Sequence, residues 1–156
     1  MKRIITLALA TALGLAAVAL GGCAATNASM ESSDMGVWGY VVADKNAQLD
    51  AAADQPGGDR IVVDRVLSPE PAWLVVHLEV DGKPGMRVGL VHIDKGESTD
   101  IVVPLEDVTT DDVIVALHAD RGTPETFDFD MEKATSSFDR PFFVNEKELA
   151  LVVTVR

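Results

Sequence analysis

The sequence contains a single cysteine, Cys23, among its 156 residues. One thiol cannot form an intramolecular disulfide, so the folded chain must be stabilised by packing. Aromatic residues make up only 5% of the chain, and 13 basic residues face 25 acidic ones, which gives a formal net charge of −12. A surface this acidic repels phosphate backbones, which argues against nucleic acid as a partner.

The signatures of common enzymes are also missing. The chain has no Gly-rich phosphate loop and no His-Glu-x-x-His pair. Residues 96–100 (GESTD) begin like a nucleophile elbow, but the closing glycine is absent and the segment lies between two predicted strands. We therefore expect no enzymatic activity, no catalytic residue and no cofactor.

The N-terminus has the layout of a secretory signal. Lys2 and Arg3 precede residues 4–20, an uncharged and mostly aliphatic run, and two glycines then lead to Cys23. A retained transmembrane helix is the alternative. However, the run has about the minimum length that spans a bilayer, and no basic cluster follows it.

Residues 20–23 (LGGC) resemble the lipobox of bacterial lipoproteins. The resemblance implies cleavage before Cys23 and attachment of diacylglycerol to its thiol. Two acyl chains anchor stably where one does not, because each buried CH₂ contributes about 0.8 kcal/mol. Ala25 is not aspartate, which by the same resemblance favours the outer membrane, facing the periplasm, in a Gram-negative organism; in other organisms the protein would lie at the cell surface.

The predicted organisation is a signal peptide (1–22), a lipidated flexible tether (23–36) and one domain (37–156). The tether is polar and has no hydrophobic period. Residues 37–42 favour a first strand or an extended arm, and residues 48–54 are compatible with one helical turn.

From residue 60 onward, apolar residues alternate with polar ones. Leu74, Val76 and Leu78, for example, share one face of a predicted strand. No segment shows the apolar stripe of a helix. Strands are predicted at 61–67, 72–80, 86–93, 99–105, 112–119, 126–131 and 149–155. This pattern predicts an all-β fold, an antiparallel immunoglobulin-like β-sandwich of about seven to eight strands, with a closed barrel as the alternative.

Several short pieces resemble an uncharacterised family of secreted β-sandwich domains, a domain of unknown function found in archaea and bacteria. The resemblance covers residues 50–156. It is carried by these segments: 54–55 (DQ), 61–64 (IVVD), 72–77 (AWLVVH), 100–105 (DIVVPL), 117–120 (LHAD), 127–129 (FDF) and 138–142 (FDRPF). It implies a β-sandwich outside the cytosol and no particular mechanism.

Three histidines are candidates for a metal site, because imidazole is the commonest ligand for zinc and copper. His77, His92 and His118 all fall in predicted strands. His118 and Asp120 are two residues apart, so they share a face if the strand continues that far, and His77 is a possible third ligand. The alternative is that these histidines are half-buried and hydrogen-bonded to backbone carbonyls.

The acidic residues have structural interpretations. Asp128, Asp130 and Glu132 alternate, which favours a solvated strand face over a calcium site. Asp139 is expected to accept backbone N–H groups and brace a turn. Residues 132–145 form the longest irregular segment, whose three phenylalanines are expected to cover an edge of the core: Phe138, Phe142 and Phe143.

The sequence thus predicts a lipid-anchored, extracytoplasmic binding or structural module of the cell envelope, without catalytic function. The membrane is its expected partner through the anchor at Cys23, and a protein or envelope partner remains open. The alternative is an extracytoplasmic metal-binding lipoprotein that uses His118, Asp120 and His77.

Overall fold

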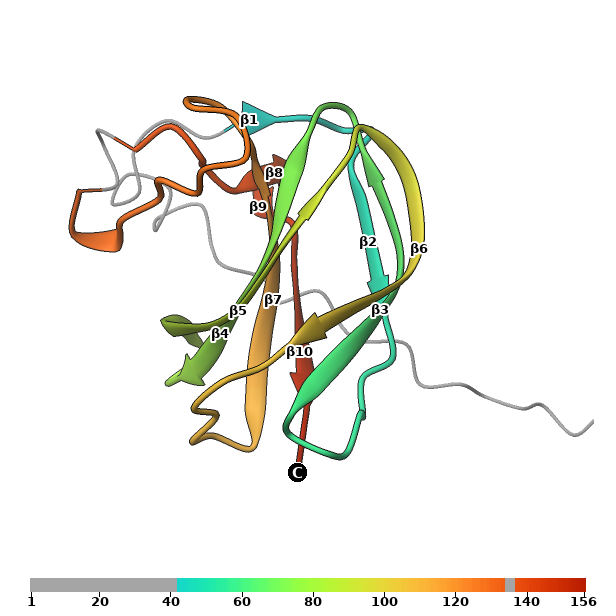
Figure 1. Cartoon of the computed structure of the whole chain (residues 1–156), viewed down its shortest axis with the longest axis vertical. Coiled ribbons are helices and arrows are strands. Elements are labelled where there is room, and N and C mark those ends of the chain that lie inside the picture. Colours follow the sequence, from blue (N-terminus) through green and yellow to red (C-terminus); the bar gives the residue numbers. More distant parts are fainter. Residues whose placement is uncertain (1–41, 134–136) are drawn as a thin grey trace, which may run out of the picture.

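The structure, a computed structural model, describes residues 42–133 and 137–156. Within them the chain folds into ten strands and one short 3₁₀ helix, η1 (Met131–Lys133) (Figure 1). The predicted signal peptide and tether, with Cys23, lie outside the described residues. No helix in the described part of the chain is long and apolar enough to cross a membrane.

The described strands form three sheets. A four-stranded antiparallel sheet has the order β10-β7-β4-β5, and a three-stranded antiparallel sheet has the order β2-β3-β6. The third sheet, β1-β8-β9, is small and contains one parallel pair, β1 with β8. The strand bounds are β1 (Val42–Ala43), β2 (Gln48–Ala51), β3 (Arg60–Ser68), β4 (Ala72–Val80), β5 (Lys83–Ile93), β6 (Gly96–Pro104), β7 (Asp112–Ala119), β8 (Phe142–Val144), β9 (Lys147–Glu148) and β10 (Ala150–Thr154).

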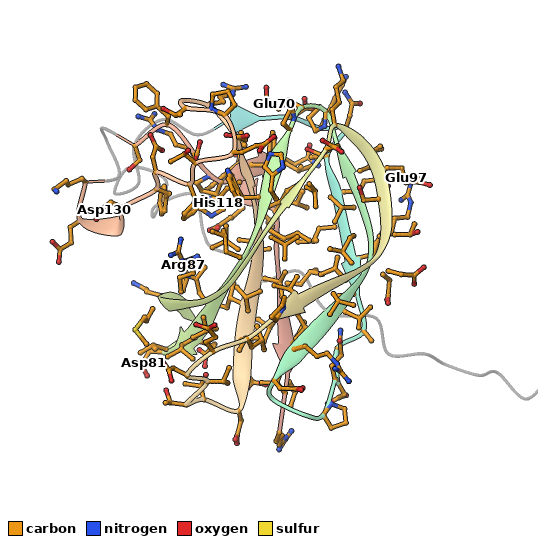
Figure 2. The ribbon with its side chains drawn as sticks, in the orientation of Figure 1. Glu70, Asp81, Arg87, Glu97, His118 and Asp130 are labelled. Carbon is orange, nitrogen blue, oxygen red and sulfur yellow. The ribbon has the colours of Figure 1, made fainter. Side chains whose placement is uncertain are left out.

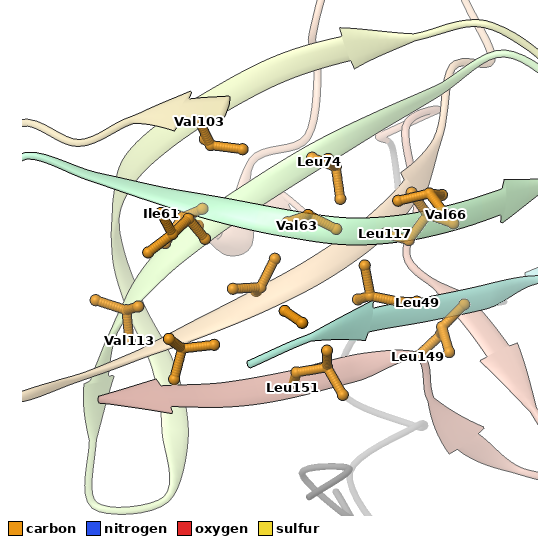
Figure 3. Packing of buried hydrophobic residues seen from close by; sticks show 14 of the residues in the cluster. Leu49, Ile61, Val63, Val66, Leu74, Val103, Val113, Leu117, Leu149 and Leu151 are labelled. Carbon is orange, nitrogen blue, oxygen red and sulfur yellow. The ribbon is translucent and has the colours of Figure 1, made fainter. Parts of the chain in front are cut away.

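The two larger sheets pack face to face around one apolar core, as Figure 3 shows. On β3, Ile61 and Val63 are fully buried while Val62 between them is more exposed, so one face of this strand is dry. Leu74 and Leu117 reach the same core from the four-stranded sheet. The predicted all-β antiparallel sandwich is confirmed, and the described strands form separate sheets where the alternative was a closed barrel.

Two hairpins use turns that require positive φ angles. Asp81 and Gly82 have φ values of 53° and 78°, and Asn145 and Glu146 have values of 52° and 66°. Two consecutive residues with positive φ are typical of the type I′ turn, whose twist matches that of the strands it joins. The β4–β5 turn is therefore tight, and β5 begins at Lys83, three residues earlier than predicted.

Two predictions about local structure were wrong. Residues 48–54 do not form a helical turn, because Gln48–Ala51 pairs with β3 as strand β2. Residues 126–131 do not form a strand. The backbone N–H of Asp128 is instead bound by the side chain of Asp139, and the N–H of Asp130 by the hydroxyl of Ser137, so these groups cannot join a ladder.

Residues 120–133 and 137–141 form a lobe beside the four-stranded sheet (Figure 1, orange). It is fastened at its base, where Ala119 N–H donates to Arg140 O at 2.9 Å and His118 bridges to Pro141. Two of the three phenylalanines expected to cover the core do so, since Phe142 and Phe143 are buried. The prediction was wrong for Phe138, which remains 60% exposed.

Candidate functional site

His77 and His118 lie on neighbouring strands, on the face of the four-stranded sheet that is turned away from the core. Their alternate neighbours Leu74, Val76 and Leu117 enter the core, so the histidines point to the other side. Both are almost completely buried, and their ring centroids are 6.3 Å apart. Figure 2 shows His118 where the lobe meets the sheet.

Both imidazoles have a defined tautomer. Nδ1 of His77 lies 2.9 Å from Gly85 O, and Nδ1 of His118 lies 2.9 Å from Asp139 O. A carbonyl only accepts, so each Nδ1 carries the proton. Burial lowers the pKa of His118 to about 3, and it also lowers the pKa of His77, where the charge of Arg87 adds a smaller effect. Both rings are therefore neutral at physiological pH and leave Nε2 unprotonated.

Aromatic side chains of the lobe enclose His118. Phe129 makes an edge contact with the imidazole at 4.8 Å between ring centroids, and Phe127 lies at 5.7 Å. The guanidinium of Arg87 stacks over Phe127 at 5.2 Å from its ring centre. The outer face of the sheet is thus covered here by apolar rings and one cation.

Asp120 contacts His92, whereas the sequence suggested that it would lie beside His118. Its Oδ2 accepts from His92 Nε2 at 3.0 Å and from Glu125 N–H at 3.0 Å. The strand ends at Ala119, and the N–H of Asp120 turns to Pro71 O, so the two-residue period from His118 no longer applies. Asp120 Oδ1 and the nearby Trp73 Nε1 are buried without a hydrogen-bond partner among the described residues.

Two aspartates fasten the lobe by binding each other's backbone. Asp139 Oδ2 accepts from Asp128 N–H at 2.9 Å, and Asp128 Oδ1 accepts from Asp139 N–H at 2.9 Å. Asp139 Oδ1 also accepts from Arg121 N–H at 2.8 Å. Asp139 therefore braces the chain as predicted, and burial raises the pKa of its carboxyl.

The predicted acidic row is distributed over separate structural roles. Asp128 belongs to the aspartate pair, and Asp130 Oδ1 accepts from Glu132 N–H at 2.9 Å. Because these residues are not in a strand, they do not form the expected solvated strand face. In residues 42–133 and 137–156, no group of three or more His, Cys, Asp or Glu side chains is arranged to hold a metal ion.

A buried acid that sequence reasoning overlooked lies on β9. Glu148 is only 7% exposed, and burial raises the pKa of its carboxyl to about 7. In the sequence it follows the Asn-Glu-Lys turn and looks like another surface charge. The available signal was its position directly before the apolar run of residues 149–155, where alternation from exposed Lys147 turns Glu148 inward.

The comparison with protein families gives one match, to the family described as Domain of unknown function (DUF7282), over residues 47–155. The chain belongs to this family. The DUF7282 domain contains every described strand except β1, and the resemblance to a domain of unknown function is confirmed. Neither the curated proteins nor the solved structures include a match to the chain.

Proposed function

We propose that this DUF7282 protein is a lipid-anchored binding or structural module of the cell envelope, without catalytic activity. The observation that carries the proposal is the LGGC segment at residues 20–23, placed directly after an uncharged apolar run. The segment supplies the only thiol of the chain at the position that acylation requires. The polar segment 24–36 then separates the anchor from the folded domain.

The character of the domain supports a binding or structural role. Its buried polar groups are used mainly to fasten backbone, as in the Asp128–Asp139 pair and the two histidine contacts with carbonyls. Such contacts hold a rigid scaffold that presents its surface loops and strand edges to a partner.

Metabolic labelling with palmitate tests the anchor. The wild type should incorporate label and partition into detergent, whereas Cys23→Ala should do neither. Thr26→Ala, in the tether, is the matched control and should behave as the wild type. Equal labelling of the wild type and Cys23→Ala would refute the proposal, as would an unlabelled wild type in the aqueous phase.

Metal binding is the second candidate function, and one observation favours it. His77 and His118 each donate Nδ1–H to a carbonyl, the arrangement that orients metal-ligating histidines and leaves Nε2 free. Asp120 is occupied by His92 and Glu125, which leaves the histidine pair as the better ligand set. Calorimetry with copper, zinc and calcium tests it: binding lost in His118→Gln supports the site, and absence of heat at millimolar metal rejects it.

A further inference from the structure

A groove opens on the side of the sandwich, between edge strand β2 and the β8–β9 hairpin. Its volume is about 420 Å³, and it is lined by Ala47–Asp50 and by residues of the hairpin. After the end of β2 the chain is joined to β10, where Thr154 N–H donates to Ala53 O at 2.8 Å. At the other end Asp44 N–H donates to Phe143 O at 3.0 Å. Backbone hydrogen bonds thus hold the chain in place both before and after β2.

Within the described residues, the edge of β2 that faces the groove is not paired with another strand. β2 is the outer strand of its sheet and pairs only with β3 there. The side chains of Gln48 and Asp50 turn instead toward Arg65, at 2.6 Å and 3.7 Å respectively. Gln48 and Asp50 therefore line the groove, but each already has a partner in Arg65.

Glu148 is the unusual group in the groove. The residue is 7% exposed, and no hydrogen bond or ion pair of the described residues includes its carboxyl. Its oxygens are not among the described atoms that are fully buried without a partner, so they reach the groove. A largely buried carboxylate without a partner is costly, so such a group either takes up a proton or acquires a cation. Four apolar residues line the same space, Ala47, Leu49, Val144 and Leu149, and the rest of the wall is polar.

We propose that this groove is a binding site for an organic cation, an alkylammonium or guanidinium group on an apolar stem, which pairs with the carboxylate of Glu148. The apolar part of the wall accepts the stem, and the carboxylate accepts the N–H donors of the head group. The strongly acidic chain attracts cations to its surface. A hard divalent ion fits less well, because it needs six or more oxygen ligands and Glu148 is a single unshared carboxyl.

Binding must be linked to proton release. Because burial raises the pKa of Glu148 to about 7, the cation replaces a proton at lower pH. Two other charged residues line the groove: Asp50, which is turned to Arg65, and Lys147, which is exposed on the rim. Neither contributes to the pKa of Glu148, which burial alone determines. Affinity should therefore follow the ionisation of this one group.

The test is a titration of the full chain in detergent with n-pentylammonium and n-butylguanidinium, followed by backbone amide NMR. We expect millimolar dissociation constants at pH 8, shifts centred on Leu49 and Glu148, and about tenfold weaker binding at pH 6. Glu148→Gln, a near-isostere whose fold the same spectra report, should abolish binding. Glu146→Gln should retain it, and Lys147→Gln should retain or strengthen it.

Neutral 1-pentanol separates charge recognition from apolar packing. Equal binding of pentanol and pentylammonium would overturn the proposal, and so would unchanged cation binding in Glu148→Gln or no shifts at 50 mM probe. A lysine-containing tripeptide distinguishes the sources of the cation. Tighter binding than pentylammonium, with shifts along β2, identifies a peptide side chain, and equal or weaker binding identifies a free amine. These outcomes do not depend on whether Cys23 is acylated.

Discussion

Glu148 should make the stability of the domain depend on pH in an unusual direction. Its carboxyl has a pKa of about 7 in the folded protein against 4.5 in its ordinary state, because burial penalises the charged form. Between these two values the folded chain holds a proton that the unfolded chain has released. The contribution of Glu148 to folding stability is therefore largest below pH 4.5 and is lost as the pH rises toward 7.

The size of the effect follows from the two pKa values. Each pH unit that separates them corresponds to about 1.4 kcal/mol, so the interval from 4.5 to about 7 amounts to about 3 kcal/mol. Glu148→Gln replaces the acid by a neutral group of nearly the same shape. Relative to the wild type, this variant should gain up to about 3 kcal/mol of unfolding free energy between pH 4.5 and pH 8.

Urea denaturation of wild type and variant at half-unit pH steps measures this difference directly. Glu146→Gln is the matched control, because this residue is exposed at the tip of the same hairpin. Its stability should follow that of the wild type at every pH. A difference between wild type and Glu148→Gln that stays constant from pH 4.5 to pH 8 would show that the carboxyl is not buried as described.

Two further substitutions test the packing of the core and the fastening of the lobe. Phe142→Ala should lower the unfolding free energy by about 3–5 kcal/mol, because the side chain is fully buried, whereas Phe138→Ala at the exposed position should change it by less than about 0.5 kcal/mol. Urea denaturation compares the two variants, and equal effects would contradict the burial of Phe142 and the exposure of Phe138. Asp139→Asn replaces one of two accepting oxygens by a donor, so we expect the unfolding free energy to fall by about 1–3 kcal/mol and the backbone N–H of Arg121 or Asp128 to exchange faster with solvent. Asp94→Asn, at an exposed position, should change neither the unfolding free energy nor the exchange rates.

The strands that the sequence predicts best are the two central strands of the four-stranded sheet. The bounds of 72–80 and 112–119 are the same in prediction and structure, because each is a mostly apolar run that is buried on both faces. Residues 126–131 alternate strictly between apolar and polar residues, yet they form no strand. Their Phe side chains cover the sheet from outside, while side chains from residues 137 and 139 take their backbone N–H groups. Such long-range competition for backbone groups leaves no local pattern.

The candidate site was only partly predictable for the same reason. The sequence indicates that histidines lie on strands, but the strand order decides which of them meet. His118 lies across from Trp73 on β4 and near His77, whereas Asp120 leaves the strand and contacts His92. Glu148 was missed because neither its burial nor its lack of a partner can be deduced from one charged residue after a turn.

His118 and Glu148 act on stability in opposite directions over an overlapping pH range. The folded pKa of His118 is about 3 against 6.5 ordinarily, so below pH 6.5 only the unfolded chain takes up its proton, and stability falls as the pH falls. Glu148 has the reverse effect between pH 4.5 and about 7. From pH 4.5 to 6.5 the two contributions, each about 1.4 kcal/mol per pH unit, offset one another. His77 acts in the same direction as His118, and Asp139 in the same direction as Glu148. As the pH falls from 6.5 to 4.5, the stability of Glu148→Gln should therefore decrease more steeply than that of the wild type, because the uptake of protons by His118 in the unfolded chain is no longer offset by Glu148.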